Sequence, residues 1–210
     1  PVFSCMLAHY GAKHPKKITG KCLVEYKYDG VRVIAIVKNN KATLYSRNGK
    51  IFNNFPHIEE ALSKSEYNNL VLDGEVMSDD FQALMKQVYR KSGAETDDAY
   101  LALFDILPLK EFNNGKSKLN TLDRKKQLDQ LSQTFENCIK LVDYAILNFD
   151  DEKDNQKFSK MNKEALDKGY EGLMIKPSEN YYESKRSHAW LKIKPFIEVT
   201  LKIVSIQEGT

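Results

Sequence analysis

Apolar and polar residues alternate along much of this chain, as they do in strands that bury one face. From Cys22 to Tyr28 the alternation puts Leu23, Glu25 and Lys27 on one side of a strand. Similar apolar-rich runs cover residues 31–38, 42–46, 70–76, 100–107, 141–147, 170–176, 190–195 and 196–206. Many short strands separated by turn residues predict a fold that is rich in β-sheet.

Helical spacing of apolar residues occurs between these runs. The predicted helices cover residues 56–62, 80–88, 121–131 and 154–168. Pro56 suits the first turn of its helix, and Asp80 suits an N-cap. The apolar stripe of 80–88 is interpreted as core packing. Helices are therefore predicted to accompany the strands.

Turn residues predict how the first strands connect. Asp29-Gly30 is a strong signal for a two-residue β-hairpin. Asn39-Asn40 is a second turn, and the segment 46–50 is a third that contains Asn48-Gly49. The strands 22–28, 31–38 and 42–46 are therefore expected to form an antiparallel meander. Further loops are predicted at 113–115 and 181–186.

Composition places few further limits on the chain. Its 210 residues suit one large domain or two small ones, and 41% hydrophobic residues suffice for a sizeable core. A net charge of +3 does not by itself indicate a nucleic-acid partner. The three cysteines lack metal-ligand spacing and indicate reduced thiols in an intracellular protein, with Cys22 in the core. No run is long enough to cross a membrane and no signal peptide is evident, so no membrane partner is expected.

Lys27 is the first candidate for chemistry. It ends a predicted strand immediately before Asp29-Gly30, with Glu25 on the same face and Arg32 just beyond the turn. A lysine held at a strand end by a tight turn can act as a nucleophile. The six residues from Lys27 to Arg32 would equally suit a surface hairpin with an ordinary solvated lysine. Short motifs alone do not separate the two interpretations.

Charged residues also stand at other strand ends or turns, where a buried strand would carry none. They are Lys27, Arg47, Glu75, Glu171, Lys192 and Lys194. Each is individually explained as a solvated strand end. Together they could converge on one groove, with the cations binding phosphates and the carboxylates holding a divalent metal. Phe104, expected on one face with Tyr100, Ala102 and Ile106, is either a core aromatic or a stacking surface for a nucleobase.

These residues fall into an ordered series of motifs that covers nearly the whole chain. The series is Lys27-Tyr-Asp-Gly-Val-Arg32, Ser46-Arg-Asn-Gly49, Asp73-Gly-Glu75, Leu103-Phe-Asp-Ile-Leu107, Glu171-Gly-Leu-Met-Ile-Lys176 and Trp190-Leu-Lys-Ile-Lys-Pro195. It resembles the covalent nucleotidyltransferases, and within them the adenylation domain of ATP-dependent DNA ligases of bacteriophage or viral style. The first motif is shared with mRNA capping enzymes, whereas Ser-Arg-Asn-Gly and Trp-Leu-Lys-Ile-Lys-Pro favour a ligase.

The resemblance implies a role for each matched position. Lys27 would attack the α-phosphate of ATP and become a lysyl-AMP, while Lys192 and Lys194 neutralise that phosphate. The remaining nucleotide-binding residues would be Glu25, Arg32, Arg47, Glu75, Phe104 and Lys176, with Phe104 stacked on adenine. Glu171, together with Glu75, would hold Mg²⁺ (or Mn²⁺). Lys185 and Arg186, with Lys202 and the loop 13–21, would contact the phosphates of nicked double-stranded DNA.

The same resemblance implies an architecture and a setting. It implies an α+β fold, a nucleotidyltransferase (ATP-grasp-like) domain over 1–195 that is built from two antiparallel sheets flanked by helices, with the nucleotide groove between them. Residues 196–210 would be the first strand of a truncated OB-fold domain, so weak self-adenylylation and weak nick closure are expected. The protein would be a monomer in the cytoplasm of a bacterial or phage-infected host. A capping guanylyltransferase, an RNA ligase and a catalytically inert nucleic-acid-binding module remain the alternatives.

Overall fold

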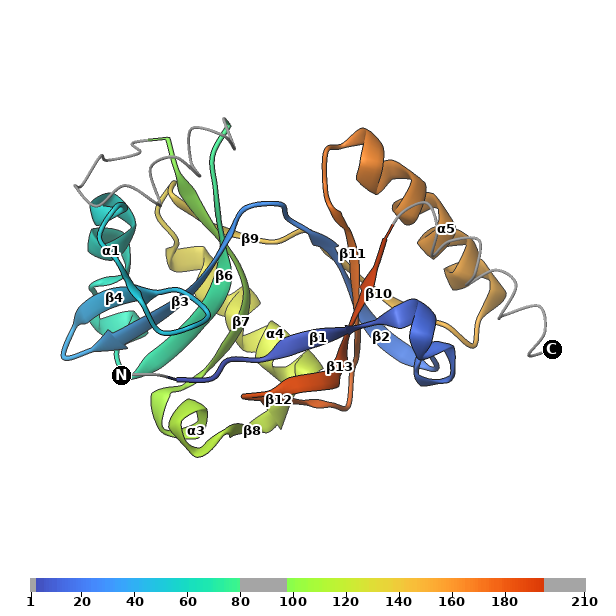
Figure 1. Cartoon of the computed structure of the whole chain (residues 1–210), viewed down its shortest axis with the longest axis horizontal. Helices are drawn as coiled ribbons and strands as arrows, with labels where there is room; N and C mark the ends of the chain where they lie inside the picture. The colour runs from blue at the N-terminus through green and yellow to red at the C-terminus, as the bar shows by residue number, and fades with distance from the viewer. Residues whose placement is uncertain (1–2, 80–97, 195–210) are drawn as a thin grey trace. The chain divides into compact units, whose positions relative to one another are not determined.

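The computed structural model describes residues 3–79 and 98–194. The chain forms two compact units, which are described separately. Unit 1 comprises Pro1–Cys5, Asp29–Leu119 and Asp123–Val142, and unit 2 comprises Met6–Tyr28, Asn120–Leu122 and Asp143–Thr210. The α+β class is confirmed, because strands dominate both units and a few helices accompany them (Figure 1). The predicted helix 80–88, the strand 196–206 and Lys202 lie outside the described residues.

Unit 1 contains a six-stranded sheet in the order β5-β4-β3-β6-β7-β9. The strands are β3 (Val31–Lys38), β4 (Lys41–Tyr45), β5 (Ile51–Phe52), β6 (Leu70–Met77), β7 (Tyr100–Pro108) and β9 (Ile139–Leu141). Neighbours pair antiparallel except β7 and β9, which run parallel. The short strand β8 (Lys116–Asn120) follows α3 along the chain.

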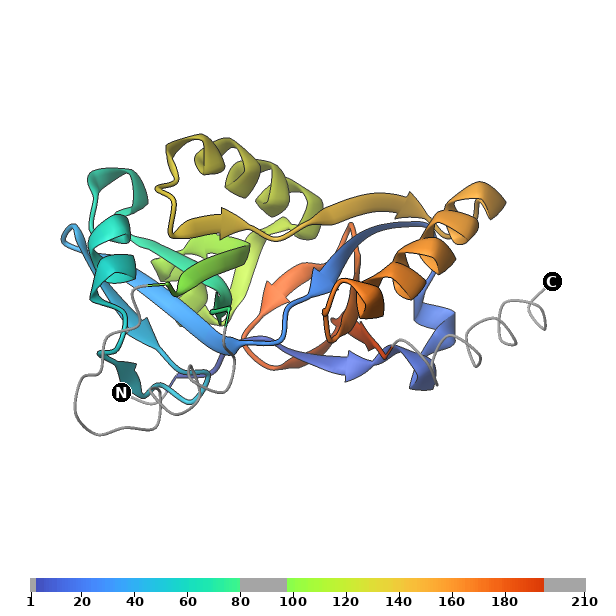
Figure 2. The ribbon, with the colours of Figure 1, turned by 90° about the horizontal axis from the view of Figure 1, so that it is seen from above.

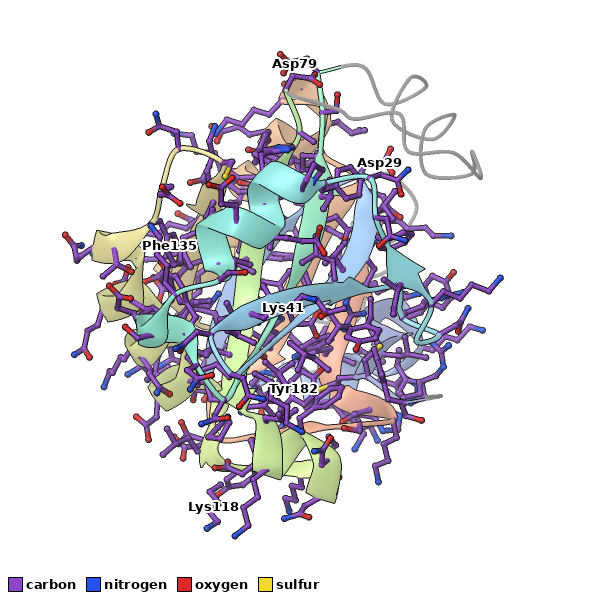
Figure 3. The ribbon with its side chains drawn as sticks, turned by 90° about the vertical axis from the view of Figure 1, so that its left-hand side faces the viewer. Asp29, Lys41, Asp79, Lys118, Phe135 and Tyr182 are labelled. Atoms are coloured by element: carbon purple, nitrogen blue, oxygen red, sulfur yellow. The ribbon has the colours of Figure 1, made fainter. Side chains whose placement is uncertain are left out.

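Helices cover this sheet. They are α1 (Pro56–Leu62), α3 (Leu109–Asn114) and α4 (Thr121–Leu131), and the short 3-10 turns are η3 (Ser65–Tyr67) and η4 (Ser132–Thr134). Figure 3 shows α1 lying across the face of the sheet, in front of its strands. Ile58 and Leu62 of α1 and Leu128 of α4 join Val33 and Leu44 in one buried cluster. The helices predicted over 56–62 and 121–131 therefore contribute side chains to the core of unit 1.

Unit 2 contains a five-stranded sheet in the order β1-β13-β11-β2-β10. The strands are β1 (Leu7–Tyr10), β2 (Lys21–Lys27), β10 (Tyr144–Asn148), β11 (Gly172–Pro177) and β13 (Arg186–Ile193), and β12 (Tyr181–Glu183) is a further short strand. The sheet is antiparallel except for the parallel pair β1 and β13. Two 3-10 turns, η1 (Gly11–Lys13) and η2 (Pro15–Lys17), follow β1.

One long helix, α5 (Glu152–Asp167), packs on the sheet of unit 2 (Figure 2). Asp151 caps it, because its side chain accepts a hydrogen bond from the backbone N–H of Lys153, so the helix begins two residues earlier than the apolar spacing predicts. Phe158 and Ala165 of α5 are buried with Val24 and Leu173 of the sheet. This packing leaves the opposite face of β2, which carries Glu25 and Lys27, for other contacts.

The predicted hairpin at Asp29-Gly30 is wrong, and so is the three-stranded meander. β2 pairs with β10 and β11, whereas β3 pairs with β4 and β6 in the other sheet. Gly30 serves a different purpose: a Cβ on it would lie 2.2 Å from the carbonyl oxygen of Val76 and 2.6 Å from the sulfur of Met77. Glycine is required there because the backbone of β6 passes too close for any side chain. The turn at Asn39-Asn40 does join β3 to β4, as predicted.

Other boundaries also differ from the predictions. The run 141–147 is two strands, because Val142 donates its N–H to Leu103 in unit 1 while the carbonyl of Asp143 accepts from Tyr26 in unit 2. The predicted loop 113–115 is the end of α3, which Gly115 terminates in a left-handed conformation with φ of +87°. Part of the predicted loop 181–186 is β12.

One face assignment in β7 is also wrong. Ile106 packs in the core cluster with Leu101 and Leu103 instead of sharing a face with Ala102. The register against β6 is irregular here, since Asp73 pairs with Asp105 but Gly74 pairs with Leu103. This β-bulge at Phe104 reverses the alternation beyond it.

Candidate active site

Lys27 and Glu171 meet because of the register of two strands. Lys27 ends β2, where it pairs with Gly172 at the start of β11, and its carbonyl accepts a hydrogen bond from the N–H of Glu171. The two side chains then form an ion pair, with Lys27 Nζ 2.6 Å from Glu171 Oε2. The side chain of Lys27 is 24% exposed and that of Glu171 is 50% exposed. A positioned amine is therefore available to a reactant beside a carboxylate.

The ion pair also occupies this amine. A lysine attacks phosphorus through the lone pair of its Nζ, and here the Nζ lies 2.6 Å from Glu171 Oε2. A reaction at Lys27 must therefore break this contact first.

A second ion pair involves the same strand and is buried in the interior of unit 2. Glu25 sits opposite Met174 of β11, and its Oε1 is 2.6 Å from the Nζ of Lys176. The two side chains are 3% and 2% exposed, respectively. Lys176 Nζ also lies 4.3 Å from the centre of the Trp190 ring. Charges this deeply buried need partners, so Glu25 and Lys176 form a fixed support two residues from Lys27.

The lysines of the last motif gather on one aromatic ring. The Nζ atoms of Lys192 and Lys194 lie 4.4 and 4.8 Å from the centre of the Tyr10 ring. Lys13 approaches the same ring at 5.7 Å. Tyr10 ends β1, where it pairs with Lys192 of β13. The negative face of the ring attracts all three ammonium groups, so this edge of unit 2 concentrates positive charge.

Unit 1 holds the remaining predicted nucleotide ligands. Arg32 forms a two-pronged ion pair with buried Asp73, with Nε–Oδ1 and Nη2–Oδ2 distances of 2.6 Å each. Its guanidinium carbon also lies 5.4 Å from the centre of the Phe104 ring. The paired geometry fixes Arg32 more firmly than a single bond would. The structure thus brings Arg32 and Phe104 together.

Helix α4 holds the bulge that carries Phe104. Arg124 donates through Nε and Nη2 to the carboxylate of Asp105, at 2.8 and 3.1 Å, and both side chains are buried. Lys125 donates to the carbonyl of Phe104 at 2.9 Å. These buried, charge-assisted bonds hold the irregular backbone in place and thereby orient the Phe104 ring.

The other predicted residues occupy different surroundings. Arg47 is exposed in the turn before β5, and Glu75 is half-buried on β6 opposite Arg32. Lys185 is exposed and pairs with Glu183 at 3.4 Å. Arg186 donates to the carbonyl of Ala8 at 2.6 Å and so also ties β13 to β1.

Three residues with positioning roles were missed from the sequence. Asp73 and Asp105 lie within two of the motifs. A carboxylate inside a strand of otherwise apolar residues was the signal that each of them binds a cationic side chain. Tyr10 carried no such signal, because only the parallel pairing of β1 with β13 brings it beside Lys192.

The carboxylates Glu171 and Glu75 can be compared with the ligands that the expected metal, Mg²⁺, requires. Mg²⁺ prefers hard carboxylate and water oxygens and retains several waters. Glu171 offers such an oxygen from a half-exposed side chain at the reactive amine, and it fits. Glu75, the other predicted metal ligand, belongs to unit 1.

Comparison with known proteins decides the family. Residues 5–194 match the protein family "ATP dependent DNA ligase domain". The chain belongs to the ATP-dependent DNA ligase family. The matched family is that of the DNA ligases, so capping guanylyltransferases, RNA ligases and inert binding modules are not favoured.

Individual relatives agree with this family assignment. The chain is 31% identical to "DNA ligase 2" of Methanosarcina acetivorans, covering 87% of this chain and 34% of that protein. It is 34% identical to a "DNA ligase" of Methanococcoides burtonii, covering 90% of this chain and 34% of that protein. The chain therefore spans about a third of the length of these ligases.

Solved structures of ligases share the fold. The structure "Pmar-Lig_Pre." has a TM-score of 0.87 at 43% identity, over 94% of this chain and 47% of that chain. The bacteriophage T7 ATP-dependent DNA ligase in complex with ATP has a TM-score of 0.67 at 23% identity, over 92% of this chain and 69% of that one. The predicted nucleotidyltransferase fold is confirmed. Among the described residues of this ligase domain, no helix has the length and apolar character needed to cross a membrane.

Proposed function

We propose that this ligase-family chain carries out the adenylation chemistry of DNA nick sealing, with Lys27 as the nucleophile. The lone pair of Lys27 Nζ attacks the α-phosphorus of ATP, the bond to the bridging oxygen breaks, and pyrophosphate leaves. The amine loses its proton and the product is a lysyl-AMP. A 5′-phosphate oxygen of a DNA nick then displaces the lysine, and the adjacent 3′-hydroxyl finally displaces AMP.

The observation that carries this proposal is the contact between Lys27 and Glu171. The register of β2 and β11 places a partly exposed amine at a strand end, against a carboxylate from a different motif. The nearby pair Glu25–Lys176 is buried and fixed, which limits movement of the strand that carries Lys27. A nucleophile held in this way needs little reorganisation to attack.

Other residues of both units support the same chemistry. Lys192 and Lys194 are positioned cations suited to the charge that spreads over the α-phosphate oxygens. We assign Glu25 and Lys176 to the adenosine side and phosphates of ATP. In unit 1, Arg32, Arg47, Glu75 and Phe104 are assigned to the nucleotide, with Phe104 stacking on adenine. Lys185, Arg186 and the loop 13–21 are assigned to the phosphates of nicked duplex DNA, which the protein would engage as a monomer.

Glu171 is assigned to Mg²⁺ (or Mn²⁺), and Glu75 of unit 1 stays a predicted metal ligand. When bound, the ion would neutralise phosphate oxygens and would draw the carboxylate of Glu171 away from Lys27. The residues themselves perform the rest: Glu171 holds the amine in place until the substrate is bound, and Lys27 supplies the new bond.

Labelling with [α-³²P]ATP and Mg²⁺ tests the proposal. Label should remain on the denatured protein, map to Lys27 and be absent from Lys27→Arg, which keeps the positive charge and the ion pair. Labelling by GTP in place of ATP, or labelling that persists in Lys27→Arg, would contradict it.

A second assay separates the first step from the later ones. A nicked duplex that already carries AMP on its 5′-phosphate needs no attack by Lys27. Lys27→Arg should therefore seal this substrate at a rate close to that of the unsubstituted chain, and sealing of a nicked RNA duplex in preference to DNA would contradict the DNA assignment.

A further inference from the structure

Three of the four histidines of the chain come together in unit 2, outside the proposed adenylation chemistry. His9 lies in β1, His14 lies between η1 and η2, and His188 lies in β13. All three side chains are half-buried. The fourth histidine, His57, lies in α1 of unit 1.

The fold brings these rings into contact. The His9 and His188 rings are stacked, with centroids 3.9 Å apart and an angle of 8° between their planes. His14 meets both rings edge-on, at 5.3 Å from His9 and 4.3 Å from His188. One ring nitrogen from each residue can be chosen so that all three atoms lie within 4.8 Å of one another.

An irregular strand pairing produces this arrangement. Along β1 and β13, Ala8 pairs with Ser187 but His9 pairs with Leu191, so residues 188–190 are extra on β13. Arg186 secures the start of this bulge through its bond to the carbonyl of Ala8. Bulges often re-aim a side chain at a functional site, and this one places His188 against His9.

We propose that His9, His14 and His188 form a binding site for one transition-metal ion of the Zn²⁺ class. Imidazole nitrogen suits zinc, copper and nickel, whereas Mg²⁺ prefers oxygen. Three histidines and one open position, filled by water, make a four-coordinate zinc site. This site therefore differs in its chemistry from the magnesium position assigned to Glu171.

The rings must turn and approach one another to close around an ion. Bonds of about 2.0–2.1 Å in a tetrahedral site put ligand nitrogens about 3.3 Å apart. A bound ion lies in the plane of each imidazole, so the stacked His9 and His188 rings must rotate about their Cβ–Cγ bonds. Partial exposure of both side chains permits this rotation. The cations Lys17, Arg186 and Lys192 interact with these histidines and oppose a second positive charge, so moderate affinity is expected.

A bound ion would join two parts of unit 2 next to the motif lysines. His9 directly precedes Tyr10, and His188 lies on the same strand as Lys192. The ion would hold β1, the η1–η2 connection and β13 together. It would therefore stabilise the part of unit 2 in which Lys192 and Lys194 contact the Tyr10 ring.

Cobalt(II) titration of the 210-residue chain tests the site directly, because four-coordinate Co²⁺ absorbs strongly in the visible range. One equivalent should bind with this absorption, and added Zn²⁺ should displace it. His14→Asn and His188→Asn should each weaken binding by more than about tenfold. The matched control His57→Asn should bind like the unsubstituted chain.

Several outcomes would overturn the proposal. The absence of saturable Co²⁺ absorption would do so, as would Co²⁺ binding that is unchanged in both His14→Asn and His188→Asn. Weakening of Co²⁺ binding in His57→Asn to the same extent would also contradict it. A near-ultraviolet charge-transfer band of a cobalt–thiolate bond would assign the ion to a cysteine instead. Circular dichroism shows whether each variant is folded. These readouts do not involve adenylylation, so they succeed or fail independently of the proposed function.

Discussion

Lys27 Nζ and Glu171 Oε2 are 2.6 Å apart although 144 residues separate them along the chain. The same two residues share a backbone hydrogen bond, because the N–H of Glu171 donates to the carbonyl of Lys27. The ion pair is thus anchored by the backbone of two strands as well as by opposite charge. It holds the amine in one position, partly exposed at the end of β2.

Glu171→Gln should slow self-adenylylation by about a hundredfold or more, in the range seen when one preorganised electrostatic group is removed. The amide keeps the size of the side chain but loses the charge that binds a cation. The Mg²⁺ concentration for half-maximal labelling should therefore rise. Single-turnover labelling over a Mg²⁺ series measures both quantities, and a variant with unchanged rate and Mg²⁺ dependence would exclude the role given to Glu171.

Glu25→Gln and Lys176→Met should each lower the free energy of unfolding by about 3–5 kcal/mol, because each leaves one buried charge without its counter-charge. The double substitution should cost less than the sum of the two. Urea denaturation measures all three variants. The exposed pair Lys160–Glu164, at 3.9 Å, is the matched control, and its loss should cost no more than about 0.5 kcal/mol. Additive losses at Glu25 and Lys176 would show that the pair is not coupled.

Tyr10→Leu should weaken ATP-dependent labelling several-fold while Tyr10→Phe leaves it nearly unchanged. Each cation–π contact is worth about 0.5–1 kcal/mol, and phenylalanine keeps the ring that holds Lys192 and Lys194. Single-turnover labelling over an ATP series should show a larger effect on the rate at saturating ATP than on the ATP concentration for half-maximal rate. Equal loss in both variants would mean that the hydroxyl, not the ring, is required.

Gly30→Asn should destabilise unit 1 by about 1–3 kcal/mol, because its Cβ collides with the backbone of Val76. Gly115 is the contrasting control. It has a φ of +87° and open space around it, and asparagine tolerates the left-handed region. Gly115→Asn should therefore be nearly neutral in thermal unfolding. If Gly30→Asn is neutral as well, then close approach is not the reason for glycine at that position.

Cys138 should react slowly with iodoacetamide in the native protein at neutral pH. Burial raises the pKa of the Cys138 thiol, so less of the reactive thiolate is present than in the unfolded chain. The labelling rate should rise at a higher pH than the ordinary cysteine value of about 8.5. Mass spectrometry of labelled peptides over a pH series, with urea-unfolded protein as reference, measures the displacement. Coincident profiles would contradict it.

The sequence by itself determined the side-chain faces of individual elements and the family. Alternation over residues 22–28 put Glu25 and Lys27 on one face, and helical spacing located the helix that is α5, because both patterns follow from local backbone geometry. The ordered motifs were specific enough to indicate a DNA ligase. Burial of Cys22 was also predictable from its place in an apolar strand.

Only the tertiary structure decided which strands become neighbours. Asp29-Gly30 has the composition of a hairpin, yet β2 and β3 enter different sheets, because β2 pairs with β10 and β11 from distant segments. The bulge at Phe104 depends on buried Arg124, and the contacts of Lys27 with Glu171 and of His9 with His188 depend on strand register. A local sequence pattern determines which side chains share a face of a strand. It does not determine the partner strand, because strand pairing depends on burial and hydrogen bonding across the whole fold.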